Sequence, residues 1–231
     1  MRKREGYHDG PSAARTDRAG AAASLPAPGR SAPIRCGGVL DVVGVPIDPD
    51  SPAEQFRRAA ATFSAVAHAV PPDRWDDPSP CEGWSARDVV THMVEWMPGL
   101  LASIGAPVAG VPDAATDPAT AWDRLAAGIQ AVLDDPDRAR REITHEHLGT
   151  LTVERAIGMT MTGDVLVHTW DVARATGGDE RLPADLVRQQ AEGMAAMGDA
   201  LEQSGHFGPV VAVPDDADEQ TRMLGLSGRR V

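Results

Sequence analysis

The segment "DVLVHTWD", residues 164–171, places three side chains with chemical potential on one side of a predicted helix. Asp164, His168 and Asp171 are spaced at i, i+4 and i+7, which brings them to one helical face. The residues between them are mostly apolar. Two carboxylates and an imidazole seldom turn toward an apolar layer unpaired, because burying a polar group without a partner is costly. Their partner is therefore another side chain, a metal ion or water.

The spacing of these residues limits how a metal ion could be shared. A helix rises about 1.5 Å per residue, so positions 164 and 168 lie about 6 Å apart, and positions 168 and 171 about 4.5 Å. Positions 164 and 171 are about 10.5 Å apart, too far for both carboxylates to bind one ion. We expect at most one carboxylate ligand, with the other capping, orienting the imidazole or pairing with an arginine.

His92, on an earlier predicted helix, could complete such a site. Two histidines and one carboxylate leave coordination positions open for water or substrate, which is typical of catalytic rather than structural sites. An ordinary core role competes with this hypothesis for a single histidine. His145 and His147, in "THEH", are expected at the surface. Cys81 could be a nucleophile, but nothing beside it in "PSPCEGWS" supplies a base or a helix N-terminus at the thiol.

Helices with clear start and stop signals are expected to position these residues. Ser, Asp and Pro supply the starts, and Pro and Gly supply the stops. Pro98 is expected to kink or end the second helix. The connection over residues 135–152 has room for a short extended segment. The pattern predicts an all-α antiparallel bundle with one long crossover, built from five helices over residues 51–70, 85–100, 117–132, 153–176 and 183–204.

Charge divides the chain into a basic start and an acidic body. Residues 1–40 contain seven basic and three acidic residues, a net charge of +4, so residues 41–231 carry −16 within the total of −12. Because this first segment is rich in Arg, Ala, Gly, Pro and Ser, residues 1–48 are predicted to form a disordered tail, or to precede the true start near Val43 or Val45. The ordered domain is expected over residues 50–228.

Composition also excludes some classes of function. The strongly acidic body argues against a nucleic-acid partner, which would require a face of Lys and Arg. No apolar run approaches the roughly 18 residues of a membrane span. The two cysteines, Cys36 and Cys81, cannot form a disulfide framework and fit the reducing cytoplasm. The sequence leaves the oligomeric state open, with a homodimer as one option.

Two motifs together resemble a known family. "PSPCEGWSARDVVTHMV" is followed some seventy residues later by "GDVLVHTWDVARATG". This pair resembles the DinB-like superfamily, and within it the metal-binding domain of the mycothiol-dependent maleylpyruvate isomerases. The resemblance covers roughly residues 50–228 and implies a four-helix bundle that binds a divalent metal, usually zinc. Carried over to this chain, the implied ligands are His92, Asp164 and His168. Asp164 stands where the family often has Glu, and Asp171 is the alternative carboxylate.

The resemblance also implies a chemistry. The metal would receive a low-molecular-weight thiol such as mycothiol and help it to ionise, for a transferase or isomerase reaction with an electrophile. Maleylpyruvate isomerases carry a further C-terminal domain used in catalysis, which this chain is too short to include, and this argues against the isomerase reaction itself. One rival hypothesis is a non-catalytic metal-binding bundle that acts as a sensor or interaction module. Another is a bundle without metal, in which Asp164 and His168 pair with arginines.

Overall fold

The computed structural model describes residues 50–198, 201 and 207–231. The predicted disordered tail, residues 1–48, lies outside the described residues, so it stays a prediction. No helix in the described part of the chain is long and apolar enough to cross a membrane.

The described chain is mostly helical, as the periodicity predicts. The predicted fourth helix is one continuous helical stretch with a wider π-helical turn in its middle. The segments that carry or support the predicted site are α1 (Pro52–Ala69), α2 (Ala86–Ser103), α3 (Pro118–Leu133), α5 (Val153–Ile157), the π-turn η1 (Gly158–Thr162) and α6 (Gly163–Thr176).

Side-chain caps fix where these helices begin. The hydroxyl of Ser51 accepts a hydrogen bond from the backbone N–H of Glu54, and the carboxylate of Asp117 accepts one from Thr120. Ser85 and Asp88 form a reciprocal capping box at the start of α2, as their spacing predicts. Gly177 ends α6 in the left-handed region, at φ 73°. The chain therefore reads its main boundaries from local sequence.

Pro98 does not end α2. The helix continues five residues beyond it, to Ser103. Proline removes one backbone donor and crowds the preceding turn. Met97 and Leu101, on either side of it, are fully buried in the core. Packing of this face outweighs the local cost of the proline.

The long connection contains more regular structure than a single extended segment. A short helix, α4 (Pro136–Ala139), leads into an antiparallel hairpin of β1 (Glu142–His145) and β2 (Gly149–Thr152). The strict all-α prediction therefore needs this small sheet added. His147 is exposed and His145 is partly exposed, so the predicted surface position of this pair is confirmed.

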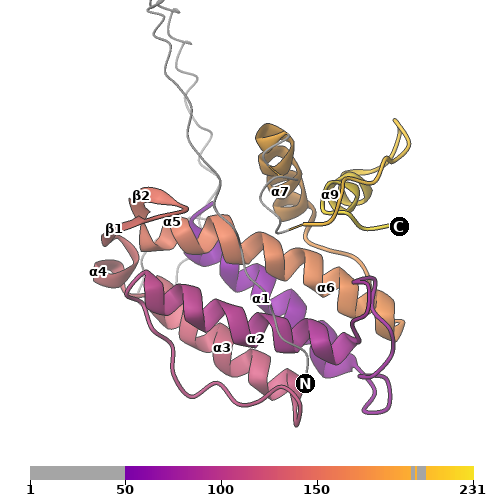
Figure 1. The fold of residues 1–231 in the computed structure, drawn as a ribbon, viewed down its shortest axis with the longest axis horizontal. Helices are drawn as coiled ribbons and strands as arrows, with labels where there is room; N and C mark the ends of the chain where they lie inside the picture. The colour runs from indigo at the N-terminus through magenta and orange to yellow at the C-terminus, as the bar shows by residue number, and fades with distance from the viewer. Residues whose placement is uncertain (1–49, 199–200, 202–206) are drawn as a thin grey trace, which may run out of the picture. The chain divides into compact units, whose positions relative to one another are not determined.

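Two apolar cores meet at α6. In the first core, α1 contacts α3 and α6, and α2 also contacts α3 and α6 (Figure 1). The second core joins α6 to α7 (Ala184–Met197) and α9 (Glu219–Leu226). Every residue of α6 from Val165 to Ala173 is buried. The predicted extension of the fifth helix toward Ser204 falls largely outside the described residues.

Candidate metal centre

The polar face of α6 meets His92 of α2. One nitrogen from each of His92 and His168 and one carboxylate oxygen of Asp164 all lie within 4.8 Å of one another. The two imidazole rings are 5.3 Å apart between centroids. His168 Nε2 is 3.4 Å from Asp164 Oδ1. The contact between α2 and α6 thus brings together the three residues that the sequence singled out.

Asp164 has an oxygen with no partner in the described structure. Its Oδ2 is buried and accepts no hydrogen bond, and its side chain is only 18 % exposed. Buried carboxylate oxygens are normally satisfied, because an unpaired one costs the full desolvation free energy. An oxygen of this kind beside two imidazoles is a donor set that a divalent ion such as zinc accepts. The residues present therefore fit a metal.

Asp171 is in the opposite situation. Its Oδ2 accepts from His168 Nδ1 at 2.8 Å and from a guanidinium nitrogen of Arg229 at 2.7 Å. Its Oδ1 accepts from Arg229 Nε at 3.2 Å, and the Cys81 thiol donates to Oδ2 at 3.4 Å. The side chain of Asp171 is completely buried. Asp171 therefore pairs with an arginine and orients the imidazole, two of the roles expected for the carboxylate that is not a ligand.

Cys81, His168 and Asp171 form a second close group, also within 4.8 Å. A cation already occupies it, because the Arg229 guanidinium bonds both Asp171 oxygens and donates to Cys81 Sγ at 3.3 Å. The group therefore lacks the unpaired acceptor that distinguishes Asp164. The cluster of His92, Asp164 and His168 is the better metal site of the two.

The charges of the cluster shift the pKa values of its members. Burial lowers the pKa of His92, and the nearby His168 lowers it further. Burial also acts to lower the pKa of His168, but the Asp164 charge and the hydrogen bonds from Asp164 and Asp171 raise it well above its usual value. Burial acts to raise the pKa values of Asp164 and Asp171, yet contacts with His168 leave both lowered. Without a metal, His168 is the proton carrier of the cluster.

Two tryptophans flank the cluster. The Trp84 ring lies 5.0 Å from the His92 ring and stacks at 6.4 Å on His168, and Trp96 lies 6.1 Å from His92. Trp84, Trp96 and His92 are each partly exposed, whereas His168 is buried. The cluster is therefore reached from the His92 side and shielded by apolar rings.

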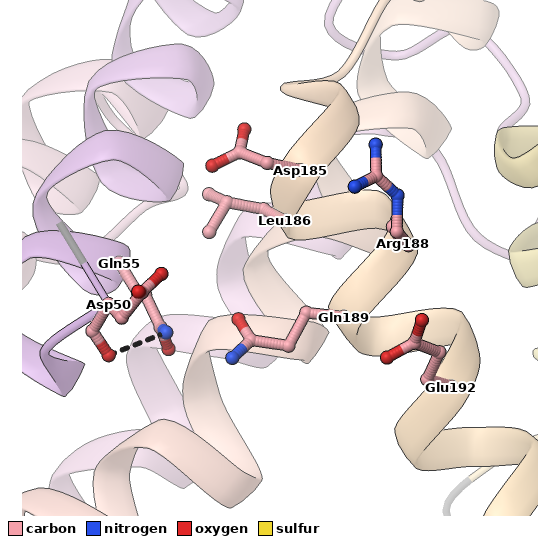
Figure 2. Close-up of a pocket in the computed structure, with 7 residues that line it drawn as sticks. All are labelled: Asp50, Gln55, Asp185, Leu186, Arg188, Gln189 and Glu192. Atoms are coloured by element: carbon pink, nitrogen blue, oxygen red, sulfur yellow. Dashed lines mark hydrogen bonds between the residues drawn. The ribbon is translucent and has the colours of Figure 1, made fainter. Parts of the chain in front are cut away.

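The hollow drawn in Figure 2 lies elsewhere. It has a volume of about 250 Å³ and lies against α7 and the start of α1. Its charged groups have partners outside it, since Asp185 pairs with Arg58 and Arg188 with Glu219. None of its lining residues belongs to the metal cluster, and we assign it no role. The lining residues are Asp50, Gln55, Asp185, Leu186, Arg188, Gln189 and Glu192.

Comparison with known proteins agrees with this geometry. The family model described as the mycothiol maleylpyruvate isomerase N-terminal domain matches residues 56–173. The chain belongs to this family. The family is DinB-like, as the two motifs indicated. Its matched region includes His92, Asp164, His168 and Cys81 but ends before Arg229.

Two curated relatives are similar over most of the chain. Both are uncharacterized proteins of Mycobacterium tuberculosis, one from strain CDC 1551 / Oshkosh and one from strain ATCC 25618 / H37Rv. Each is 26 % identical over 182 residues, which is 78 % of this chain and 98 % of the relative. No solved structure matches the chain.

The arginine beside the site was missed from the sequence. Arg87, Arg155 and Arg174 are the nearest arginines along the chain, and Arg155 is the preferred candidate on sequence grounds. In the structure, Arg87 pairs with Asp76, Arg174 pairs with Glu180, and Arg155 is exposed on α5. Arg229 takes the position instead, from the closing "SGRR". No local pattern identifies it, because its contact with Asp171 spans 58 residues.

Proposed function

We propose that this protein binds one divalent ion, with zinc as the expected metal, through His92, Asp164 and His168. The observation that carries this proposal is the unpaired buried Oδ2 of Asp164 beside two imidazole rings. The scaffold would be a DinB-like antiparallel four-helix bundle over residues 50–228, with α1, α2, α3 and the α5–α6 stretch as its helices. The protein would act in the cytoplasm, in keeping with its few cysteines.

The reaction class we propose is thiol-dependent transfer or isomerisation, with mycothiol or a similar thiol as the co-substrate. An unperturbed thiol has a pKa near about 8.5, so most of it is protonated at neutral pH. A dication in this cluster would supply the charge that lowers this pKa and populates the nucleophilic thiolate. Membership in a mycothiol-related family supports the thiol as the small-molecule partner.

The protein's own side chains would prepare the site. Asp171 holds Nδ1 of His168 and so fixes the orientation of the ring, which directs Nε2 toward Asp164. Arg229 holds Asp171 in turn through two hydrogen bonds. Trp84 and Trp96 limit the access of water, which strengthens electrostatic interactions at the cluster.

Metal content tests the ligand set. Protein stripped with a chelator and reloaded with zinc should hold about one ion per chain, and His168→Ala should hold none. His147→Ala is the matched control, because His147 is exposed on the hairpin, and it should keep the full content. Equal metal content in all three proteins would contradict the site.

Cobalt(II) tests the thiol chemistry. Adding mycothiol to the cobalt-substituted protein should produce a sulfur-to-cobalt charge-transfer band and release protons, and His168→Ala should abolish both. Consumption of the thiol with a panel of electrophiles should then require the metal. If metal binds but no thiol produces the band, the non-catalytic metal-binding bundle becomes the better interpretation.

A further inference from the structure

A cysteine thiol lies beside the metal cluster at the molecular surface. Cys81 belongs to the loop between α1 and α2 and is partly exposed, and its neighbours Pro80, Glu82 and Gly83 are exposed. The loop is held in place, because Ser79 Oγ accepts from the N–H of Cys81 and the N–H of Trp84 donates to the carbonyl of Cys81. The sulfur is therefore presented in a fixed position that solvent can reach.

Three groups converge on one oxygen of the buried Asp171. Its Oδ2 accepts from Cys81 Sγ, from His168 Nδ1 and from Arg229, and Arg229 also donates to Cys81 Sγ. Cys81 is thus connected through a single carboxylate to the histidine that both close groups share. A change at the sulfur alters the partners of the oxygen that orients His168.

From this geometry we propose that Cys81 is a site of S-thiolation by the disulfide of a low-molecular-weight thiol, and that the adduct weakens metal binding. The second part rests on the proposed metal site. In the exchange, Cys81 sulfur attacks one sulfur of the disulfide, a new S–S bond forms and the original S–S bond breaks. Cys81 is oxidised, one half of the disulfide is reduced, and the released thiol carries the proton. A partly exposed thiol next to a guanidinium is the environment in which such exchange is favoured.

The adduct would act on the metal cluster through Arg229 and Asp171. A disulfide sulfur no longer donates to Asp171, and the added group needs space beside the guanidinium, whose side chain is only 11 % exposed. Displacing Arg229 would release the second partner of Asp171, and the His168 ring would lose its fixed orientation. Loss of such orienting contacts typically lowers metal affinity by about 10-fold to about 100-fold.

The reactivity of Cys81 is tested in a Cys36→Ser background, where it is the only remaining cysteine. With 4,4′-dithiodipyridine as the probe, the folded protein should release about one equivalent of thiopyridone, and Cys36→Ser/Cys81→Ser should release none. Circular dichroism confirms that both variants are folded. Reaction of Cys81 only after denaturation would overturn the proposal.

The coupling to the metal is measured on the same sample. A chromogenic chelator should take zinc from the thiolated protein at a concentration at least tenfold lower than from the unmodified protein, and a phosphine reductant should reverse the change. Full thiolation with unchanged zinc affinity would overturn the coupling. If the protein holds no metal before modification, the proposed function fails, whereas thiopyridone release still decides whether Cys81 is a modification site.

Discussion

Two aspartates on one helix face have opposite surroundings. Asp171 has both oxygens engaged, by Arg229, His168 and Cys81, whereas Asp164 keeps a buried oxygen without a partner. The two residues share a type, a helix and a face, so the difference comes from what surrounds each of them. It is this difference that assigns the metal to Asp164 and the orienting role to Asp171.

Replacing each aspartate by asparagine separates these roles. Asp164→Asn should abolish zinc retention, because the ligand charge is lost. Asp171→Asn should keep a stoichiometry near one ion but lower the affinity by about 10-fold to about 100-fold. It should also reduce the free energy of unfolding by about 3 kcal/mol, because it leaves the buried Arg229 charge unpaired. Metal analysis and chemical denaturation of the two variants provide the measurements. The reverse pattern would make Asp171 the ligand.

The raised pKa of His168 predicts how metal binding depends on pH. Asp164 and Asp171 stabilise the imidazolium, so in the metal-free protein a proton occupies this ring at neutral pH. The ion must displace that proton, and its affinity should therefore rise by about tenfold per pH unit until the pH passes the pKa of His168. Zinc titrations between about pH 6 and about pH 8 measure the slope.

The same pKa fixes the sign of a stability effect. Because the folded-state pKa is raised, His168 stabilises the metal-free fold fully below its unfolded-state pKa, and this contribution is lost as the pH rises through the folded-state value. Zinc should therefore protect against thermal unfolding more strongly at higher pH. A zinc affinity that does not change with pH would mean that His168 is not a ligand.

Much of this site could be predicted from the sequence, but its supports could not. The helical spacing of Asp164, His168 and Asp171 is local, so periodicity alone places them on one face. Arg229 and Cys81 reach each other across 148 residues, and no pattern in either segment predicts that contact. Local spacing therefore identifies the face, whereas tertiary packing decides what each polar group meets.

At the level of elements, the cap of α2 is the feature closest to the site. His92 lies two turns beyond Ser85, whose hydroxyl and backbone N–H both pair with Asp88. Hydrogen bonds from the backbone and the hydroxyl of Ser85 lower the pKa of Asp88. The cap fixes where α2 begins and hence which face presents His92. By contrast, the interruption expected from Pro98 was wrong, because core burial on both sides of it overrides a local rule.

Removing this cap should destabilise the fold without touching the cluster. Ser85→Ala is expected to lower the free energy of unfolding by about 1 kcal/mol. Ser103→Ala, an exposed serine at the other end of the same helix, is the matched control and should change it by less than about 0.5 kcal/mol. The effect should diminish in acid, because the lowered pKa of Asp88 means that its contribution is lost as the pH falls through that value. Equal effects of both substitutions in urea denaturation would show that the cap is unimportant.

For the whole molecule, the central feature is that α6 lies between two cores. Val165, Leu166 and Val172 pack into the first core, whereas Val167 and Trp170 pack into the second, with α7 and α9. The family match ends at residue 173, so most of the second core lies beyond it. Arg229 comes from this added part and bonds to Asp171 on α6. The C-terminal segment is therefore part of the structural support of the candidate site.

This dependence leads to a prediction for neighbouring arginines. Arg229→Met should lower the free energy of unfolding by on the order of 3 kcal/mol, because it leaves the carboxylate of Asp171 buried with one cation fewer. Zinc affinity should fall by about tenfold or more, because Asp171 no longer holds His168 in a single orientation. Arg230→Met is the matched control, since Arg230 is exposed, and both quantities should stay near those of the unsubstituted protein. Urea denaturation and competitive zinc titration measure the two effects separately. If Arg229→Met lost stability but kept its zinc affinity, the C-terminal segment would support the fold alone, and the orientation of His168 would have to come from α6 itself.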